Sequence, residues 1–314
     1  MEQVMSSEEL LRLKKKNTRN DKISTFLLIL PYIVLFSTFI IIPVLFSFIL
    51  SFTYFDLIQV PRIADLYGFY NYVMLFTQDS NFLKFVIPNT LKYAMFVGPG
   101  GYILAFMMAW MLSQIQAKPR KYISLALYTP SLAGGVFIGI VWRTIFNGDR
   151  SGYINAILLK YELIDESIQF LISPQYLMNI MIFVTLWGSM GIGFLAMLAG
   201  LLNVDKTLYE AGYVDGIKNR FQEIIYITIP QMKPQMLFGA VMAIVGAFNA
   251  GGIGVALSGA NPTPQYAGQL IINHIEDYGF LRYEMGYAAA ISVVLLMIIL
   301  VFNKLAYTLF GEKD

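Results

Sequence analysis

Residues 203–234 read NVDKTLYEAGYVDGIKNRFQEIIYITIPQMKP and connect two long apolar segments. Asp205 is a plausible N-cap, because its side chain can accept a hydrogen bond from a free amide in the first turn of a helix. Asp215 and Gly216 form a turn signal that ends this helix. A spacing of three and four places three residues on one helical face, namely Leu208, Ala211 and Gly212. The segment is therefore a structured connection and not a simple loop.

A second amphipathic helix is expected after this turn. This helix heads back to the membrane, and its amphipathic pattern comes from residues at a helical spacing, namely Phe221, Ile224, Ile225 and Thr228. One interpretation is an interfacial helix that lies on lipid headgroups. Such a helix favours a basic polar face, whereas acidic and basic residues are balanced here. The balance favours the alternative, which is docking against another protein.

The apolar character extends over the whole chain. Of the 314 residues, 57% are hydrophobic and 13% are charged, and the mean hydropathy is +0.61. Soluble domains carry about 25% charged residues. Half of that fraction is too little to cover the water-exposed surface of a soluble domain of this size. The composition excludes disorder, disfavours a soluble enzyme and indicates a polytopic membrane protein.

Six segments are long enough to cross a bilayer, which takes roughly 20 apolar residues as a helix. Windows that are almost free of charged residues place these spans at about 25–55, 93–115, 121–143, 176–202, 235–257 and 285–309. A polar tail, 1–24, precedes them, and a short tail, 311–314, follows. An even number of spans puts both tails on the same side of the membrane.

Basic residues set the orientation of these spans. The tail 1–24 is rich in Lys and Arg, and further basic residues follow the second, fourth and sixth spans. The other three connections are poor in basic residues and are expected to face outward: Asp56–Pro88, Asn147–Pro174 and Ser258–Glu284. Both termini are therefore expected in the cytoplasm.

Several spans contain proline and glycine. Pro31 and Pro43 lie in the first span, and Gly98-Pro99-Gly100-Gly101 lies in the second. Membrane helices tolerate such residues where protein or a wet cavity satisfies the freed backbone groups. Close helix packing is the first interpretation, and it applies also to the small-xxx-small pair Gly135 and Gly139. The alternative is an unwound-helix ion site of the kind found in secondary transporters.

Patterns for catalysis and metal binding are missing from the sequence. The chain has no cysteine and one histidine, His274, which is expected on the surface. No Gly-x-x-x-x-Gly-Lys-Ser/Thr loop occurs, so the chain should not hydrolyse ATP by itself. No charged residue lies deep in spans one to five, which argues against proton coupling. We expect no catalytic residue, metal or cofactor in this chain and no nucleic-acid partner, and uphill transport would draw its energy from another subunit.

The run from Glu210 to Pro234 resembles the EAA motif of permease subunits in binding-protein-dependent ABC importers. It carries Glu-Ala-Gly at 210–212, Asp-Gly at 215–216 and Ile-x-x-Pro at 227–230. Shorter elements resemble the carbohydrate-uptake branch, of the maltose and glycerol-phosphate permease type, in the usual order: Gly68–Tyr72, Asn89–Leu91, Trp142–Arg143, Gly152–Asn155, Ala199–Leu201 and Gly286–Ala290. The chain departs from the pattern at Gly212, at Ile217 and at 259–263. The resemblance covers residues 25–310.

This resemblance implies an all-α membrane protein with six transmembrane helices, a MetI-like permease fold and a cytoplasmic coupling helix within 203–234. It implies that the coupling helix docks on an ATPase subunit. The docking residues would be Glu210, Ala211, Gly212, Asp215 and Gly216. Small Ala211 and Gly212 would let the helix sit deep in a groove, and Glu210 and Asp215 would hold it there. Alternatively, Glu210 pairs within the segment with Lys206.

The partners implied are a second, different permease subunit and two ATPase subunits, which bind ATP and Mg. An extracytoplasmic solute-binding protein would deliver a sugar or oligosaccharide and dock on the three outward connections. The location implied is a bacterial or archaeal plasma membrane. In this arrangement the chain moves the saccharide and the ATPase subunits supply the energy.

The resemblance also implies substrate contacts on the spans that flank 203–234. The candidates at matching positions are Thr185, Gly188, Ser189, Gly246 and Asn249. Trp187 is a further candidate, because aromatic faces cover the apolar side of a sugar. Among these, only Asn249 retains the chemistry of the corresponding family position. A helix-packing contact is the alternative for each of them, and many related permeases leave selectivity to the binding protein.

Two other classes of function stay open from the residues. A stand-alone secondary carrier or channel for a small neutral solute would transport without an ATPase. A membrane scaffold would show no ligand-dependent response in any assembly. Segment 203–234 favours the importer, because a self-sufficient carrier has no use for such a connection.

Overall fold

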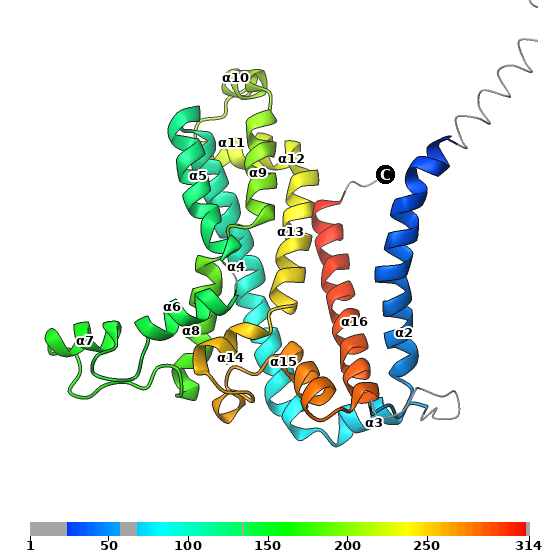
Figure 1. Cartoon of the computed structure of the whole chain (residues 1–314). Helices are drawn as coiled ribbons and strands as arrows, with labels where there is room; N and C mark the ends of the chain where they lie inside the picture. The colour runs from blue at the N-terminus through cyan, green and yellow to red at the C-terminus, as the bar shows by residue number, and fades with distance from the viewer. Residues whose placement is uncertain (1–23, 57–67, 134, 312–314) are drawn as a thin grey trace, which may run out of the picture.

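A computed structural model describes residues 24–56, 68–133 and 135–311, and within these ranges the regular elements are helices. Most of the predicted tails, 1–24 and 311–314, lies outside the described residues. Figure 1 shows a bundle of long helices with short helices gathered at its two ends. The all-α prediction is confirmed.

Three helices are each long and apolar enough to cross a membrane. The first is Ser24–Leu50, which includes the π-helical turn η1 (Ser37–Ile41) and α2 (Ile42–Leu50). The second is Phe82–Ser113, made of η3 (Phe82–Val86) and α4 (Ile87–Ser113). The third is α16 (Met285–Phe310). The second helix begins eleven residues before the predicted 93, so that it includes Lys84 and Lys92 near its start.

Three bent pairs of helices bring the number of spans to six if each pair crosses once. They are α5 (Ala117–Leu132) with α6 (Gly135–Ile145), α8 (Pro174–Trp187) with α9 (Ile192–Asn203), and α13 (Lys233–Phe248) with α14 (Gly252–Ser258). The bend is 40° between α8 and α9 and 49° between α13 and α14. The predicted spans 121–143, 176–202 and 235–257 fall on these pairs.

The short helices divide between the two ends of the bundle (Figure 1). At one end lie α10 (Lys206–Val214), α11 (Arg220–Glu223), η4 (Ile224–Thr228) and α12 (Ile229–Gln231). At the opposite end lie α3 (Tyr70–Thr77), α7 (Tyr153–Lys160), η5 (Pro264–Tyr266), α15 (Ile271–Glu276) and η6 (Asp277–Leu281). The start of the Ser24–Leu50 helix and the last turn of α16 both lie toward the first of these ends (Figure 1). We call these the α10 end and the α15 end.

Helix α4 forms the centre of the bundle and packs on α8, α9 and α13. It runs through Pro99 without a break, so the packing interpretation holds for 98–101 and the alternative of an unwound helix does not apply there. Gly98 faces Ala247 of α13, and a Cβ at Gly101 would lie 3.1 Å from Cβ of Ser189. The glycines thus bring neighbouring helices close to α4, and this protein contact lets the helix tolerate its proline.

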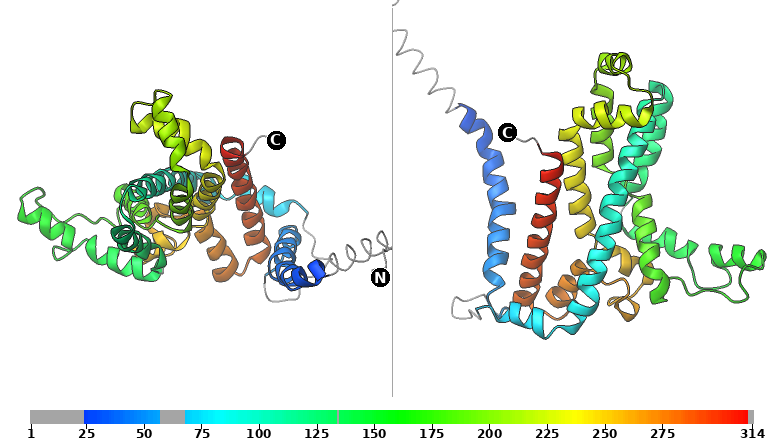
Figure 2. Two further views of the ribbon diagram at one scale, coloured as in Figure 1. Left: turned by 90° about the horizontal axis from the view of Figure 1, so that it is seen from above. Right: turned by 180° about the vertical axis from the view of Figure 1, so that it is seen from behind.

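The first span stands apart from the other helices. In its most apolar 18-residue window only 6% of the residues are buried, and Figure 2 shows it beside the bundle, with α16 as its neighbour. Side chains such as Leu28, Phe39 and Leu45 are more than half exposed. Such a surface is unfavourable in water, and it is compatible with a surrounding of lipid or of another apolar helix.

Candidate functional site

Helix α10 has well-defined ends. Asp205 caps its start by accepting a hydrogen bond from the Thr207 amide at 2.9 Å, as predicted. At the other end Gly216 has φ of +97°, the left-handed conformation that favours glycine. The Ile217 amide donates to the Gly212 carbonyl and the Gly216 amide to the Tyr213 carbonyl. This pair of bonds is a Schellman motif, and it confirms the turn predicted at Asp215 and Gly216.

The inner face of α10 is the one that contains Gly212. This glycine is buried, and a Cβ at its position would lie 2.6 Å from Cδ1 of Ile227 and 3.0 Å from Cδ1 of Ile217. The prediction placed Gly212 on one outward face with Leu208 and Ala211, and this placement is wrong. Its small size allows α10 to lie close to η4, because a larger side chain there would have to displace the Ile227 side chain.

The outer face of α10 carries the other candidate docking residues. Glu210, Ala211, Asp215 and Gly216 are all exposed. Among the described residues Glu210 forms no ion pair, so the alternative pairing with Lys206 is not present. An exposed carboxylate without a partner is available to another molecule.

Apolar side chains are exposed beside this carboxylate. Val214 is 88% exposed and Phe221 is 71% exposed, and Leu208 is also exposed. Phe221 was predicted to share the apolar face of a second helix with Thr228, but the two are not in one environment, because Thr228 is buried and Phe221 is exposed. Large apolar side chains gathered on a protruding segment are typical of a surface that another protein covers.

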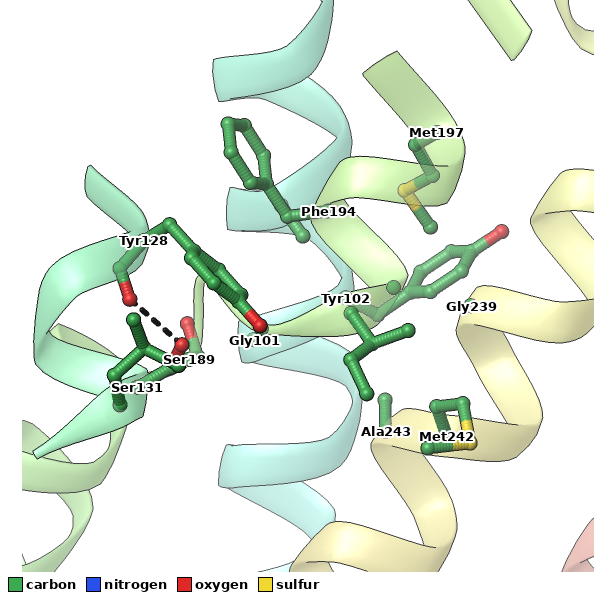
Figure 3. Close-up of a pocket in the computed structure, with 15 residues that line it drawn as sticks. Gly101, Tyr102, Tyr128, Ser131, Ser189, Phe194, Met197, Gly239, Met242 and Ala243 are labelled. Atoms are coloured by element: carbon green, nitrogen blue, oxygen red, sulfur yellow. Dashed lines mark hydrogen bonds between the residues drawn. The ribbon is translucent and has the colours of Figure 1, made fainter. Parts of the chain in front are cut away.

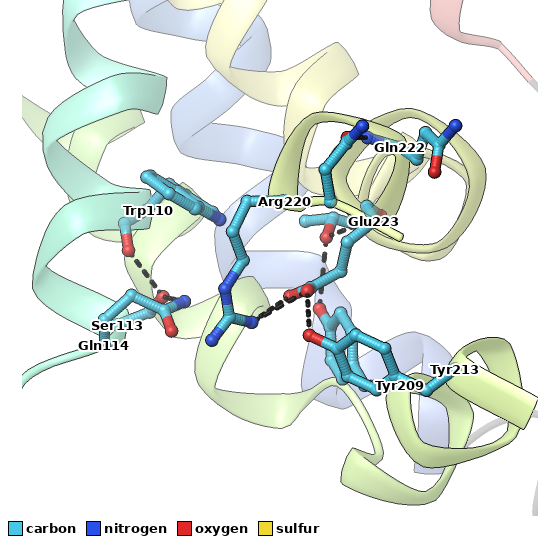
Figure 4. Close-up of polar contacts among 10 residues, drawn as sticks. Trp110, Ser113, Gln114, Tyr209, Tyr213, Arg220, Gln222 and Glu223 are labelled. Atoms are coloured by element: carbon cyan, nitrogen blue, oxygen red, sulfur yellow. Dashed lines mark hydrogen bonds and ion pairs between the residues drawn. The ribbon is translucent and has the colours of Figure 1, made fainter. Parts of the chain in front are cut away.

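A buried carboxylate joins α10 to the segment that follows it (Figure 4). Glu223 is 4% exposed, and its Oε2 accepts hydrogen bonds from the Tyr213 hydroxyl at 2.9 Å and from Arg220 at 2.7 Å. One turn earlier on α10, the Tyr209 hydroxyl lies 3.2 Å from the Thr228 hydroxyl. We call these five residues the Glu223 clamp.

The electrostatics of the clamp follow from these contacts. Hydrogen bonding to Glu223 raises the pKa of Tyr213 and also raises the pKa of Arg220. Sequence reasoning did not single out Glu223. The available signal was the spacing of three between Arg220 and Glu223, which puts the two side chains on one side of a helix.

The candidate substrate residues lie near the breaks of two bent pairs. The Thr185 hydroxyl is 2.7 Å from the Tyr93 hydroxyl, and Ser189 donates to the Leu186 carbonyl at 2.7 Å. Gly188 ends α8, and Trp187 beside it is 46% exposed. On the other pair Asn249 ends α13, where its side chain donates to the Val245 carbonyl at 2.9 Å, and Gly246 is exposed.

A cavity of about 420 Å³ opens between α4, α5, α9 and α13 (Figure 3). Ser189 is the one candidate substrate residue that lines it. The other hydroxyl groups at its wall belong to Tyr102, Tyr128 and Ser131. None of these three was identified from the sequence. None of the lining residues is charged; the rest of the wall is Gly101, Ala105, Leu132, Gly191, Ile192, Gly193, Phe194, Met197, Gly239, Met242 and Ala243.

The α15 end holds a second buried carboxylate, Asp79. It accepts hydrogen bonds from His274 Nε2 and from the Tyr287 hydroxyl, both at 2.8 Å, and from the Phe82 amide at 2.9 Å. We call these residues the Asp79 cluster. His274 is 2% exposed, so its predicted surface position is wrong. Its partner lies 195 residues away in the chain, and no local pattern reveals such a contact.

The pKa of Asp79 reflects two opposing effects. Burial favours the neutral acid, but the hydrogen bonds from His274, the Phe82 amide and Tyr287 outweigh it and lower the pKa to about 2. An ionised Asp79 can only accept hydrogen bonds. His274 therefore donates its Nε2 proton to Asp79.

Comparisons with known proteins agree with this architecture. Residues 99–310 match the family model described as binding-protein-dependent transport system inner membrane component. An arabinooligosaccharides transport system permease protein of Bacillus subtilis (strain 168) is 30% identical over 93% of this chain and 90% of its own length. A probable ABC transporter permease protein of the same organism is 31% identical over 91% of this chain and 90% of its own length.

A solved structure shares the fold. It is the crystal structure of a bacterial ABC transporter involved in the import of the acidic polysaccharide alginate, and one of its chains superposes with a TM-score of 0.72. The two chains are 26% identical, and the match covers 95% of this chain and 99% of the other. The likeness therefore includes both ends of the bundle as well as its centre.

Proposed function

The chain belongs to the family of binding-protein-dependent transport system inner membrane components, and on this premise we propose that it is the membrane-spanning subunit of an ABC importer for a neutral saccharide. A binding protein delivers the saccharide from outside, and ATP hydrolysis in separate ATPase subunits drives its passage. The observation that carries the proposal is the protruding α10, which exposes apolar side chains beside an unpaired Glu210. A subunit that worked alone would not need such a surface.

The outer face of α10 is the proposed docking face for the ATPase. Val214 and Leu208 would enter a groove of the partner, and Ala211 between them lets the backbone approach closely. Glu210 and Asp215 would accept hydrogen bonds from the rim of that groove. The left-handed Gly216 ends the helix sharply and keeps the following chain away from the partner. ATP and Mg would bind in the ATPase and not in this chain.

The α10 end would face the cytoplasm. The tail 1–24, the connection after the second span and the segment 203–234 supply most of the basic residues, and such residues favour the cytoplasmic side. The α15 end would then face outward, where α3, α7 and α15 offer surfaces to the binding protein. A second permease subunit, different from this one, would cover exposed apolar faces of the bundle in the plasma membrane.

The uncharged cavity is the proposed point of contact with the saccharide. Its hydroxyl groups, on Tyr128, Ser131 and Ser189, can exchange hydrogen bonds with sugar hydroxyls, and its apolar wall can cover the C–H faces of a sugar ring. An acidic sugar would find no cation there. Support for a saccharide comes from the arabinooligosaccharide permease at 30% identity, and the lack of charge favours a neutral one.

Reconstitution tests this proposal. The complex is purified from its native cell, placed in vesicles, and assayed for ATP hydrolysis with its binding protein and either neutral oligosaccharides or uronate oligomers. We expect a neutral oligosaccharide to stimulate hydrolysis and to accumulate in the vesicles only when ATP is present. Passage of sugar through vesicles that contain this chain alone would contradict the importer and support a stand-alone carrier.

A further inference from the structure

Helix α10 is held by few contacts. It has nine residues, and helices of this length are marginal in water without tertiary support. Within the described part of the chain, side chains attach it to η4 and α11 at three points. These are the packing of Gly212 on Ile227, the Tyr209–Thr228 contact and the Tyr213–Glu223 hydrogen bond. The position of the docking face therefore depends on these points.

The π-helical turn η4 aligns two of these attachments. Tyr209 and Tyr213 are one turn apart and lie on the same face of α10. Their partners, Thr228 and Glu223, are five residues apart, a spacing that separates side chains in an α-helix. The i→i+5 register of a π-helix brings them together, and the Thr228 hydroxyl donates to the Glu223 carbonyl at 3.3 Å. Two bonds one turn apart fix the direction of α10 and not only its distance.

The charge of Glu223 makes its attachment the strongest of the three. A hydrogen bond to an ionised group contributes about 1.5–3 kcal/mol, roughly twice the value of a neutral one. Arg220 compensates the buried carboxylate, since its guanidinium lies 2.7 Å from Oε2 while its side chain is 60% exposed.

We infer that Glu223 is a positioning residue for coupling, which joins α10 to α13 so that the two move as one body. The inference rests on the proposed function. Glu223 leads through η4 and α12 directly into α13, and α13 supplies Gly239, Met242 and Ala243 to the cavity wall. A displacement of α10 by the ATPase would thus reach the cavity. Without the clamp, α10 would tilt alone and ATP hydrolysis would not move the wall.

The test replaces Glu223 in the complete importer complex. Glu223→Gln keeps the shape of the side chain and removes its charge. We expect saccharide-stimulated ATP hydrolysis and uptake to fall about tenfold, as expected for the loss of one hydrogen bond to a charged group. The KM for ATP and recovery of the assembled complex should stay at wild-type values. Tyr213→Phe should give a similar loss. The double variant should lose no more than the single ones, because both changes act on the Tyr213–Glu223 hydrogen bond: phenylalanine removes its donor and glutamine removes the charge of its acceptor.

A matched control is Tyr226→Phe, which removes an exposed hydroxyl that has no hydrogen bond among the described residues. This variant should behave as wild type.

A rescue experiment separates a positioning role of Glu223 from a role in folding. The chain has no cysteine, so Tyr213→Cys with Glu223→Cys can be bridged by a short bifunctional thiol reagent, and the bridge should restore stimulated hydrolysis. Wild-type coupling in Glu223→Gln, or a bridged variant that stays inactive, would overturn the inference. Wild-type complex without any saccharide stimulation would instead reject the proposed function.

Discussion

Each end of the molecule has a buried carboxylate that accepts hydrogen bonds from a tyrosine hydroxyl and a nitrogen donor, Asp79 at the α15 end and Glu223 at the α10 end. The two differ in how far along the chain their partners lie. Asp79 bonds to residues 195 and 208 positions away in the chain. Glu223 bonds to residues three and ten positions away. His274 is fully enclosed, whereas Arg220 and Tyr213 are exposed. The hydrogen bonds of Asp79 therefore connect elements that are far apart in the chain, whereas those of Glu223 connect only neighbouring elements.

This difference has a mechanical consequence. The Asp79 cluster joins the turn before η3 to α15 and to the start of α16, so the α15 end is a fixed joint between distant elements. The Glu223 clamp ties α10 only to the segment that follows it, so α10 and this segment can be displaced together with α13 while the clamp stays closed. A rigid α15 end and a locally closed α10 end suit a protein on which another subunit acts at the α10 end. The following predictions test this contrast.

The largest effect is expected at the fixed joint. Asp79→Ala leaves His274 and Tyr287 buried without their shared acceptor, and breaking a buried pair in this way costs about 3–5 kcal/mol. Thermal unfolding of the purified complex should occur at a clearly lower temperature. Asp165→Ala, at an exposed carboxylate of the same end, is the matched control and should unfold as wild type. Equal unfolding temperatures for the two variants would show that the Asp79 cluster does not stabilise the α15 end.

Acid should loosen the same joint. The pKa of Asp79 is lowered from 3.8 to about 2, so its ionised form stabilises the fold above pH 3.8, and this stability is lost as the pH falls toward 2. The shift corresponds to about 2 kcal/mol. Unfolding followed between pH 5 and pH 2.5 should show a steeper loss in wild type than in Asp79→Asn. Parallel pH profiles would show that Asp79 contributes nothing through its charge.

At the end of α10 we expect a smaller loss of stability but a large loss of function. Gly216→Trp forces a bulky residue into a left-handed conformation, at about 1–2 kcal/mol, and disturbs the cap of α10. The variant should insert and stay folded but lose stimulated ATP hydrolysis. Gly216→Asn is the control, because asparagine tolerates this conformation better than other residues. Normal transport by Gly216→Trp would contradict the docking assignment.

The smallest effects are expected along the substrate path. Ser189 lines the cavity, whereas Asn249 is exposed and bonds to its own helix. Ser189→Ala should therefore raise the half-saturation concentration for uptake about two- to fivefold, the loss of one neutral hydrogen bond. Asn249→Ala should change it less. The reverse order would place the saccharide at the end of α13 and outside the cavity.

Local patterns in the sequence predicted local structure well. The cap at Asp205 and the turn at Gly216 are confirmed, because a side chain and its neighbouring amides decide them. The fold class is confirmed as well, since a bilayer leaves few options for apolar segments of this length. The burial of His274 and the inward position of Gly212 depend on contacts with other elements, which periodicity cannot supply.

Helix breaks show the same limit. Proline and glycine at 98–101 left an unwound helix open as an alternative, but α4 is continuous there, and the bent pairs break after Leu132, Trp187 and Phe248. A glycine serves equally for a bend and for a close contact, and only the neighbouring helix decides between them. Glu223 escaped notice for a related reason. Its partner Tyr213 lies on the other side of the turn at Gly216, and the direction of that turn decides whether the two side chains come into contact.

Recovery of partners through α10 tests the central claim most directly. Tagged wild-type chain and tagged Glu210→Lys are extracted from native cells in mild detergent, and the proteins recovered with each are identified by mass spectrometry. The account predicts an ATPase and a second permease with the wild type, and the second permease without the ATPase for Glu210→Lys. A homo-oligomer without any ATPase in several detergents would contradict the account.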